Sequence, residues 1–247
     1  MTSLSKDLIT KKLYLARKYN NYVDTKILYD KTFGELYEIS QKLEIQYNKS
    51  QTKCIKLGSS TRRSREVFNN KSIIYGPIIN RYLYHQTDLI GNVSKAEAEI
   101  FFKVKDNFKK REARCFLDIF SHYGYAIDFP FSCLEKNEFP YFIADLCGSG
   151  KAVISKAYEI TNFNEHEKIE LMTKNKISTD SFHNQFIFNQ EDFLNELFKS
   201  LNENSRQLVG GQIILSGGIT SCLDLTNEKN VKLNVEGRNI FDLNLIF

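Results

Sequence analysis

The apolar residues of this chain change their spacing near residue 50, and that change limits which folds the chain can adopt. Before it, apolar side chains recur at helical spacing, which predicts helices over 4–19 and 33–47. Asn48, Lys49 and Ser50 then interrupt the pattern. After them, short apolar segments alternate with glycine and proline turns, which is typical of strands.

The remaining chain is mostly β with one helical stretch. Residues 97–105 alternate between apolar and other side chains, so they predict a strand. Residues 182–202 return to helical spacing. Three further strands are predicted near the C-terminus, at 212–215, 231–235 and 243–247.

These segments predict an α+β fold in one domain. We expect a helical N-terminal region, residues 1–50, packed on a mixed β-rich body, residues 51–247. With 247 residues, the chain can bury a large core without disulfide bonds or a structural metal.

The five cysteines are scattered, with no C-x-x-C pair and an odd total. That pattern is typical of reduced intracellular thiols. No apolar run is long enough to cross a membrane, and the first ten residues lack a signal-peptide core. We therefore expect a cytoplasmic protein that binds no membrane.

The net charge of +4 comes from 34 basic and 30 acidic residues that are mixed along the chain. The densest basic cluster is Arg62, Arg63 and Arg65, which is too small to indicate a nucleic-acid site. A mildly basic surface would suit anionic substrates, although many ordinary solvated surfaces have the same composition.

Glu97-Ala98-Glu99 is the segment most suggestive of chemistry. Residues two apart in a strand project from the same face, with their Cα atoms roughly 7 Å apart. Two such carboxylates repel each other unless a cation or protons intervene. Oxygen ligands favour Mg²⁺, Mn²⁺ or Ca²⁺ over zinc. The pair alone is weak evidence, because most such pairs lie on the solvent face of a strand.

Two more charged residues lie in strand-like contexts. Asp128 precedes Phe129-Pro130 and offers another carboxylate, although an Asp before a proline is commonly a turn former. Lys56 lies between Ile55 and Leu57, where it could exchange protons with nearby carboxylates or simply lie at the surface.

Two glycine-containing segments could contact a ligand. Gly148-Ser149-Gly150 leaves backbone N–H groups free for an anion or allows a tight turn, but it matches no Walker A pattern. Residues 215–220, Leu-Ser-Gly-Gly-Ile-Thr, place two hydroxyls beside glycines. None of the four histidines forms a metal-ligand pair such as H-x-x-x-H, so we expect structural or surface histidines.

In this order and spacing, the segments resemble the 2-keto-4-pentenoate hydratase and 4-oxalocrotonate decarboxylase branch of the fumarylacetoacetate hydrolase-like enzymes. The resemblance covers nearly the whole chain, and its most specific motif is the L-S-G-x-x-T segment at 215–220. The other matching segments are Ile55-Lys56-Leu57-Gly58, Glu97-Ala98-Glu99-Ile100, Ala126-Ile127-Asp128-Phe129-Pro130 and Ala144-Asp145.

The chain also departs from the family pattern. Asp128 stands where the family has Glu, and Leu146 stands where an Asn is expected. The family's Asp-Ser-Arg after the proline reads Phe131-Ser132-Cys133 here. Gly218 replaces a common Ser or Ala. These changes bear on substrate identity and on whether activity is retained.

The resemblance implies a metal-dependent enzyme of 2-oxo acids. Mg²⁺ or Mn²⁺ would be bound by Glu97, Glu99 and Asp128 and would stabilise an enolate. The resemblance further implies catalytic roles for Lys56, in proton transfer, and Asp145, in positioning, and substrate-binding roles for Ser216 and Thr220.

The expected reaction is hydration of an unsaturated 2-oxo acid, or 2-hydroxydienoate, by a homo-oligomeric hydro-lyase. Two alternatives stay open. One is a 2-oxo acid decarboxylase of the same family, and the other is a non-catalytic family member that serves as an interaction or structural subunit.

Overall fold

The structure, a computed structural model, describes residues 4–85, 87–110, 115–186 and 190–246. Two helices of 14 and 16 residues lie in the N-terminal part, a third of 14 residues lies nearer the C-terminus, and the other described helices are shorter. The α-helices are α1 (Lys6–Tyr19), α2 (Phe33–Asn48), α3 (Arg62–Phe68), α4 (Phe116–Ile119), α5 (Phe182–Gln185) and α6 (Gln190–Glu203). The 3₁₀ helices are η1 (Thr25–Leu28), η2 (Asn80–Tyr82), η4 (Tyr141–Ile143), η5 (Leu146–Gly148) and η6 (Ile160–Asn162).

Local capping determines where the two N-terminal helices begin and end. The Ser5 side chain accepts a hydrogen bond from the backbone N–H of Leu8, and Asn20 ends α1 in the left-handed conformation. Thr32 and Glu35 form a reciprocal capping box at the start of α2. Apolar spacing alone predicts both helices to within two residues, and these caps fix where they end.

The strands of the described residues form two sheets. One has nine strands with the main order β2-β1-β11-β5-β6-β7-β3, and β12 and β8 pair with β5 and β6; the other has the order β10-β9-β13-β14-β4. The strands are β1 (Cys54–Gly58), β2 (Ile74–Ile78), β3 (Leu83–His85), β4 (Leu89–Gly91), β5 (Lys95–Val104), β6 (Phe120–Phe129), β7 (Lys151–Ile154), β8 (Tyr158–Glu159), β9 (Lys168–Met172), β10 (Ile177–Ser181), β11 (Ile213–Leu215), β12 (Leu223–Asp224), β13 (Asn230–Val235) and β14 (Arg238–Ile246).

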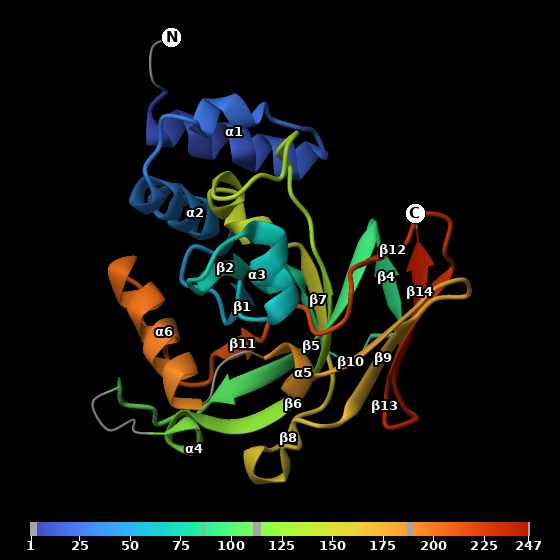
Figure 1. The fold of residues 1–247 in the computed structure, drawn as a ribbon. Coiled ribbons are helices and arrows are strands. Elements are labelled where there is room, and N and C mark those ends of the chain that lie inside the picture. Colours follow the sequence, from blue (N-terminus) through green and yellow to red (C-terminus); the bar gives the residue numbers. More distant parts are fainter. Residues whose placement is uncertain (1–3, 86, 111–114, 187–189, 247) are drawn as a thin grey trace.

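Figure 1 shows how the helices surround the larger sheet. Helices α1 and α2 lie together above the β1–β2 end, while α6 and the smaller sheet lie on opposite sides of the central strands. One buried cluster joins these parts, since it contains Leu13 of α1, Leu36 of α2, Leu57 of β1 and Leu233 of β13. Among the described helices, none is long and apolar enough to cross a membrane.

The α+β fold predicted from the sequence is confirmed. The strand predicted at 97–105 is β5, which begins two residues earlier and ends one residue earlier, at Val104. The continuous helix predicted over 182–202 is wrong, because α5 ends at Gln185 and Phe186 forms a β-bridge with Thr61. Residues 187–189 of that stretch and Phe247 of the last predicted strand lie outside the described residues. The division into regions 1–50 and 51–247 stays a prediction.

Candidate metal centre

Strand pairing brings three carboxylates together in the larger sheet. β5 and β6 are antiparallel, and their register places Glu97 directly opposite Asp128. Glu99 lies two residues along β5 from Glu97, so its side chain projects from the same face. One oxygen from each carboxylate lies within 4.8 Å of the others. The three metal ligands implied by the sequence resemblance therefore meet at one point.

Lys56 of β1 reaches the same point from a different strand. Its Nζ donates a hydrogen bond to Asp128 and lies 3.4 Å from Glu97 Oε2 and 3.7 Å from Glu99 Oε1. The side chains of Glu99 and Asp128 are fully buried, whereas those of Lys56 and Glu97 remain 12% and 23% exposed. Lys56 and Glu97 therefore form the accessible part of the centre, and both line the pocket.

Burial and repulsion from neighbouring carboxylates raise the pKa values of Glu99 and Asp128. Burial is the largest cause for Glu99, whose pKa lies well above its usual range, and Asp128 and Glu97 raise it further. Burial also raises the pKa of Asp128 to about 6, against the opposing effect of the Lys56 ammonium. For Lys56, burial lowers the pKa, but the three carboxylates outweigh it and hold that pKa well above the ordinary value.

Two buried oxygen atoms in this centre lack a hydrogen-bond donor among the described residues. They are Glu99 Oε1 and Asp128 Oδ1. Orphaned buried acceptors are costly, and a cation satisfies them. Three carboxylates against one ammonium also leave the group with an excess of negative charge. This donor set fits a divalent cation that prefers oxygen ligands, such as Mg²⁺ or Mn²⁺.

Residues 216–220 hold β5, the strand that carries Glu97 and Glu99, in place. The backbone N–H groups of Ser216 and Ile219 donate to the carbonyl oxygens of Ile100 and Ala98, both at 2.8 Å. In return, Ala98 N–H donates to Thr220 Oγ1 at 3.0 Å, and Ile100 N–H donates to Ser216 Oγ at 3.1 Å. The two hydroxyls thus complete the backbone hydrogen bonding of β5 around its glutamates.

The glycine in this segment supports Glu99 directly. Gly217 N–H donates to Glu99 Oε2 at 2.9 Å. Gly217 has φ +88°, and a Cβ there would lie 2.5 Å from Ser60 Oγ. Both facts require glycine at this position.

Ser216 and Thr220 differ in what they can offer a substrate. The Ser216 hydroxyl accepts from Ile100 and donates to the Gly217 carbonyl oxygen at 2.9 Å, so both of its roles are used. Thr220 lines the pocket beside the carboxylates, and among the described residues its hydroxyl accepts a hydrogen bond from Ala98 N–H and donates none. Substrate binding stays a prediction for both residues, and the geometry favours Thr220.

Asp145 has different hydrogen-bond partners from Lys56. Its carboxylate accepts hydrogen bonds from Arg17 Nε, from Ser132 Oγ at 2.9 Å and from Cys133 N–H at 2.7 Å. Both Asp145 and Arg17 are buried. Its catalytic role stays a prediction, and the observed contacts indicate a structural one.

Arg17 connects helix α1 to the loop that follows β6. Its guanidinium donates to the carbonyl oxygens of Phe131 at 3.1 Å, Asp145 at 2.8 Å and Ser149 at 2.9 Å. Phe131 lines the pocket, as do Asn20 and Tyr22, which follow α1. The N-terminal helix therefore shapes one wall of the pocket.

The pocket over the carboxylates has a volume of about 760 Å³, which is in the range of small-molecule sites. Lys56, Glu97 and Thr220 line it, together with Arg63 of α3. Arg63 donates to the Ile219 carbonyl oxygen at 3.0 Å and pairs with Asp180 at 3.3 Å. In the sequence, Arg63 stands out only as part of a basic cluster, because nothing local to it indicates proximity to the carboxylates.

No family model and no curated protein matches this sequence. Solved structures do match its fold. The chain is similar to 4-oxalocrotonate decarboxylase from Pseudomonas putida complexed with magnesium and adipate, with 15% identity, a TM-score of 0.83 and all of both chains covered.

Two further similarities cover 78% of this chain. A fumarylacetoacetate hydrolase family protein from Yersinia pestis matches with 13% identity, a TM-score of 0.54 and 92% of its own chain covered. Fumarylpyruvate hydrolase from Pseudomonas aeruginosa, in complex with Mn²⁺ and pyruvate, matches with 10% identity, a TM-score of 0.56 and 89% of its chain covered. The chain therefore has the fumarylacetoacetate hydrolase-like fold that its sequence motifs predicted.

Replacing Arg17 with Met should destabilise the protein by about 3–5 kcal/mol, because Asp145 would remain buried without its cation. Urea denaturation measures the change. Lys232→Met is the matched control, since it breaks an ion pair with Asp242 whose side chains are 43% and 44% exposed, and it should cost under about 1 kcal/mol. Equal losses in the two variants would contradict a special role for Arg17.

The metal-free protein should lose stability as the pH rises from about 4 to about 6. Over this window the folded state keeps the Asp128 proton that the unfolded chain has lost, because burial raises the folded pKa to about 6. The folded state then binds more protons, so Asp128 alone lowers the free energy of unfolding by about 3 kcal/mol over this window, and the raised pKa of Glu99 acts in the same direction. Urea denaturation in EDTA measures the slope, and Asp128→Asn should reduce it; an unchanged slope in that variant would contradict the assignment.

Proposed function

We propose that this chain is a divalent-metal-dependent lyase that acts on 2-oxo acids, with hydration of an unsaturated 2-oxo acid or 2-hydroxydienoate as its reaction. The supporting observation is the buried group of Glu97, Glu99 and Asp128 beside Lys56, at the edge of a pocket of about 760 Å³. We further infer from the sequence resemblance that the protein is a homo-oligomer.

Glu97, Glu99 and Asp128 would hold Mg²⁺ or Mn²⁺. The bound ion would supply Lewis acidity, polarising the C2 carbonyl of a 2-oxo acid and stabilising the negative charge that develops on its oxygen. Asp128 has a shorter side chain than Glu, and β6 places it directly opposite Glu97. The three ligands thus come from two paired strands whose register is fixed by the buried core.

Lys56 is the group that we assign to proton transfer. Its raised pKa keeps the ammonium form, so it serves as a proton donor from Nζ. The oxygen of water bonds to C4 of the unsaturated acid, C3 takes up a proton from Lys56 Nζ, and the proton that the water loses restores the ammonium. Lys56 lines the pocket with its Nζ among the carboxylates, within reach of a substrate held over them.

Substrate orientation falls to the groups around the carboxylates. The Thr220 hydroxyl keeps a hydrogen to donate to a substrate oxygen, and the Arg63 guanidinium offers positive charge to a substrate carboxylate. Phe131 and Phe142 supply apolar walls that limit the access of water. This combination suits a small acid with one polar end and one unsaturated chain.

Decarboxylation is the second candidate reaction. It is favoured by the match to a decarboxylase along the whole of both chains, whereas the hydrolases match over 78% of this chain. It would use the same carboxylates and the same proton donor. Release of carbon dioxide from a 2-oxo diacid distinguishes it from uptake of water by an unsaturated 2-oxo acid.

Oxalate, a compact mimic of a chelating 2-oxo acid enolate, should bind tightly only when Mg²⁺ is present. Isothermal titration with and without Mg²⁺ measures this, and Glu97→Gln should abolish the metal-dependent part. Glu203→Gln, which changes an exposed residue at the end of α6, is the matched control and should bind as the wild type does. Folded protein that binds neither Mg²⁺ nor oxalate would instead support a non-catalytic family member.

Replacing Lys56 with Ala should lower turnover of a 2-oxo acid substrate by about 10²-fold or more, because the proton donor is lost. Oxalate binding in the presence of Mg²⁺ should persist, since the three carboxylates remain. Steady-state kinetics on substrates found by screening measures the loss, with Lys232→Ala as a surface control. Full turnover by the Lys56 variant would remove this residue from the mechanism.

A further inference from the structure

A second group of metal-binding side chains lies outside the pocket, at the base of the β9–β10 hairpin. Glu165 and His166 occupy the turn that precedes β9, and His183 lies in α5, directly after β10. The hairpin register pairs Lys168 with Ser181, so its two open ends meet where these residues lie. The His183 N–H also donates to the Glu165 carbonyl oxygen at 2.8 Å.

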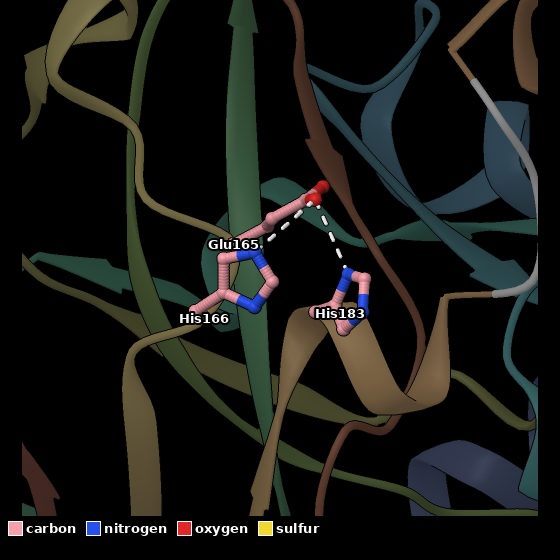
Figure 2. A group of neighbouring side chains, drawn as sticks. All are labelled: Glu165, His166 and His183. Atoms are coloured by element: carbon pink, nitrogen blue, oxygen red, sulfur yellow. Dashed lines mark hydrogen bonds and ion pairs between the residues drawn. The ribbon is translucent and has the colours of Figure 1, made fainter.

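The three side chains converge on one point. His183 Nδ1 lies 3.2 Å from Glu165 Oε1, and His166 Nε2 lies 3.8 Å from the same oxygen. The two imidazole rings are 4.2 Å apart between centroids, and the three candidate ligand atoms lie within 4.8 Å of one another. Figure 2 shows both rings beside the glutamate carboxylate, one from each side of the hairpin base.

These distances are close to those of a metal site. Ligand atoms around a tetrahedral zinc ion stand about 3.3 Å apart, given Zn–N bonds of about 2.0–2.1 Å. The observed separations need only small side-chain rotations to reach that value. The side chains are 49–65% exposed, so an ion can enter from solvent and keep water as a fourth ligand.

The ligand chemistry differs from that of the carboxylate centre. Two imidazoles and one carboxylate favour zinc and related transition metals, whereas three carboxylates favour Mg²⁺ or Mn²⁺. We propose that Glu165, His166 and His183 form a second metal site, which binds a divalent transition-metal ion such as Zn²⁺ and clamps the base of the β9–β10 hairpin.

The clamp would act on a helix that also supports the pocket. Gln185 lies in the same short helix as His183. Its side-chain amide donates a hydrogen bond to the Asp180 carboxylate at 2.7 Å and accepts one from the backbone N–H of Arg63 at 3.3 Å. Asp180 in turn pairs with the Arg63 guanidinium, which lines the pocket. An ion at His183 therefore fixes the helix that positions Arg63, without entering the pocket.

The test is titration of Zn²⁺ into the full chain by isothermal calorimetry, with excess Mg²⁺ present to occupy the carboxylate centre. We expect one Zn²⁺ per chain and a rise in the melting temperature of the wild type. His183→Ala and His166→Gln should each weaken Zn²⁺ binding by roughly tenfold or more and remove the thermal shift. His85→Ala is the matched control, because His85 is an exposed histidine outside this cluster.

Circular dichroism establishes that each variant is folded, and the two histidine variants provide independent tests if one is not. Wild-type affinity in both cluster variants, or no Zn²⁺ binding by the wild type in Mg²⁺, overturns the proposal. Glu97→Gln separates this site from the proposed catalytic one, since it should lose Mg²⁺-dependent oxalate binding while it keeps the Zn²⁺ site.

Discussion

The pairing of β5 with β6 is the constraint on which the candidate centre depends. It places Glu97 opposite Asp128 and turns Glu99 toward the same face. A shift of one residue in this register would send Asp128 to the other side of the sheet. Apolar residues that alternate with the acidic ones, such as Ala98 and Ile127, are fully buried and oppose such a shift. The same burial that builds the core therefore assembles the carboxylates.

Bringing three carboxylates together inside the protein costs free energy, and the chain offsets this cost in three ways. Lys56 contributes a cation, Gly217 contributes a backbone donor, and the segment after β11 completes the hydrogen bonding of the ligand strand. Two carboxylate oxygens are still left without donors. Buried polar groups that lack partners in the ligand-free protein are common at functional sites, because a bound ligand supplies the interaction that is missing.

The sequence predicted the parts of this structure that depend on local patterns. Helical spacing identifies α1 and α2, and alternation identifies β5, so the spacing of Glu97 and Glu99 already indicates a shared face. Local context singled out Lys56 and Asp128 as candidates, but only the family resemblance placed them beside the glutamates, because their meeting depends on strand order. Long-range contacts explain what the sequence did not reveal. Asp145 finds Arg17, which is 128 residues away, and His166 meets His183 across a hairpin without any short-range motif.

The contacts of Arg17 also affect how helix α1 unwinds. A helix at the end of a chain usually frays at little cost, independently of the rest. Here the guanidinium on the last turn of α1 satisfies three carbonyl oxygens and one buried carboxylate of the loop beside the pocket. The last turn of α1 therefore cannot unwind without releasing that loop, so the helix and the pocket wall open as one cooperative unit. Opening of this wall is thereby linked to the stability of a segment that contributes no residue to the carboxylate centre.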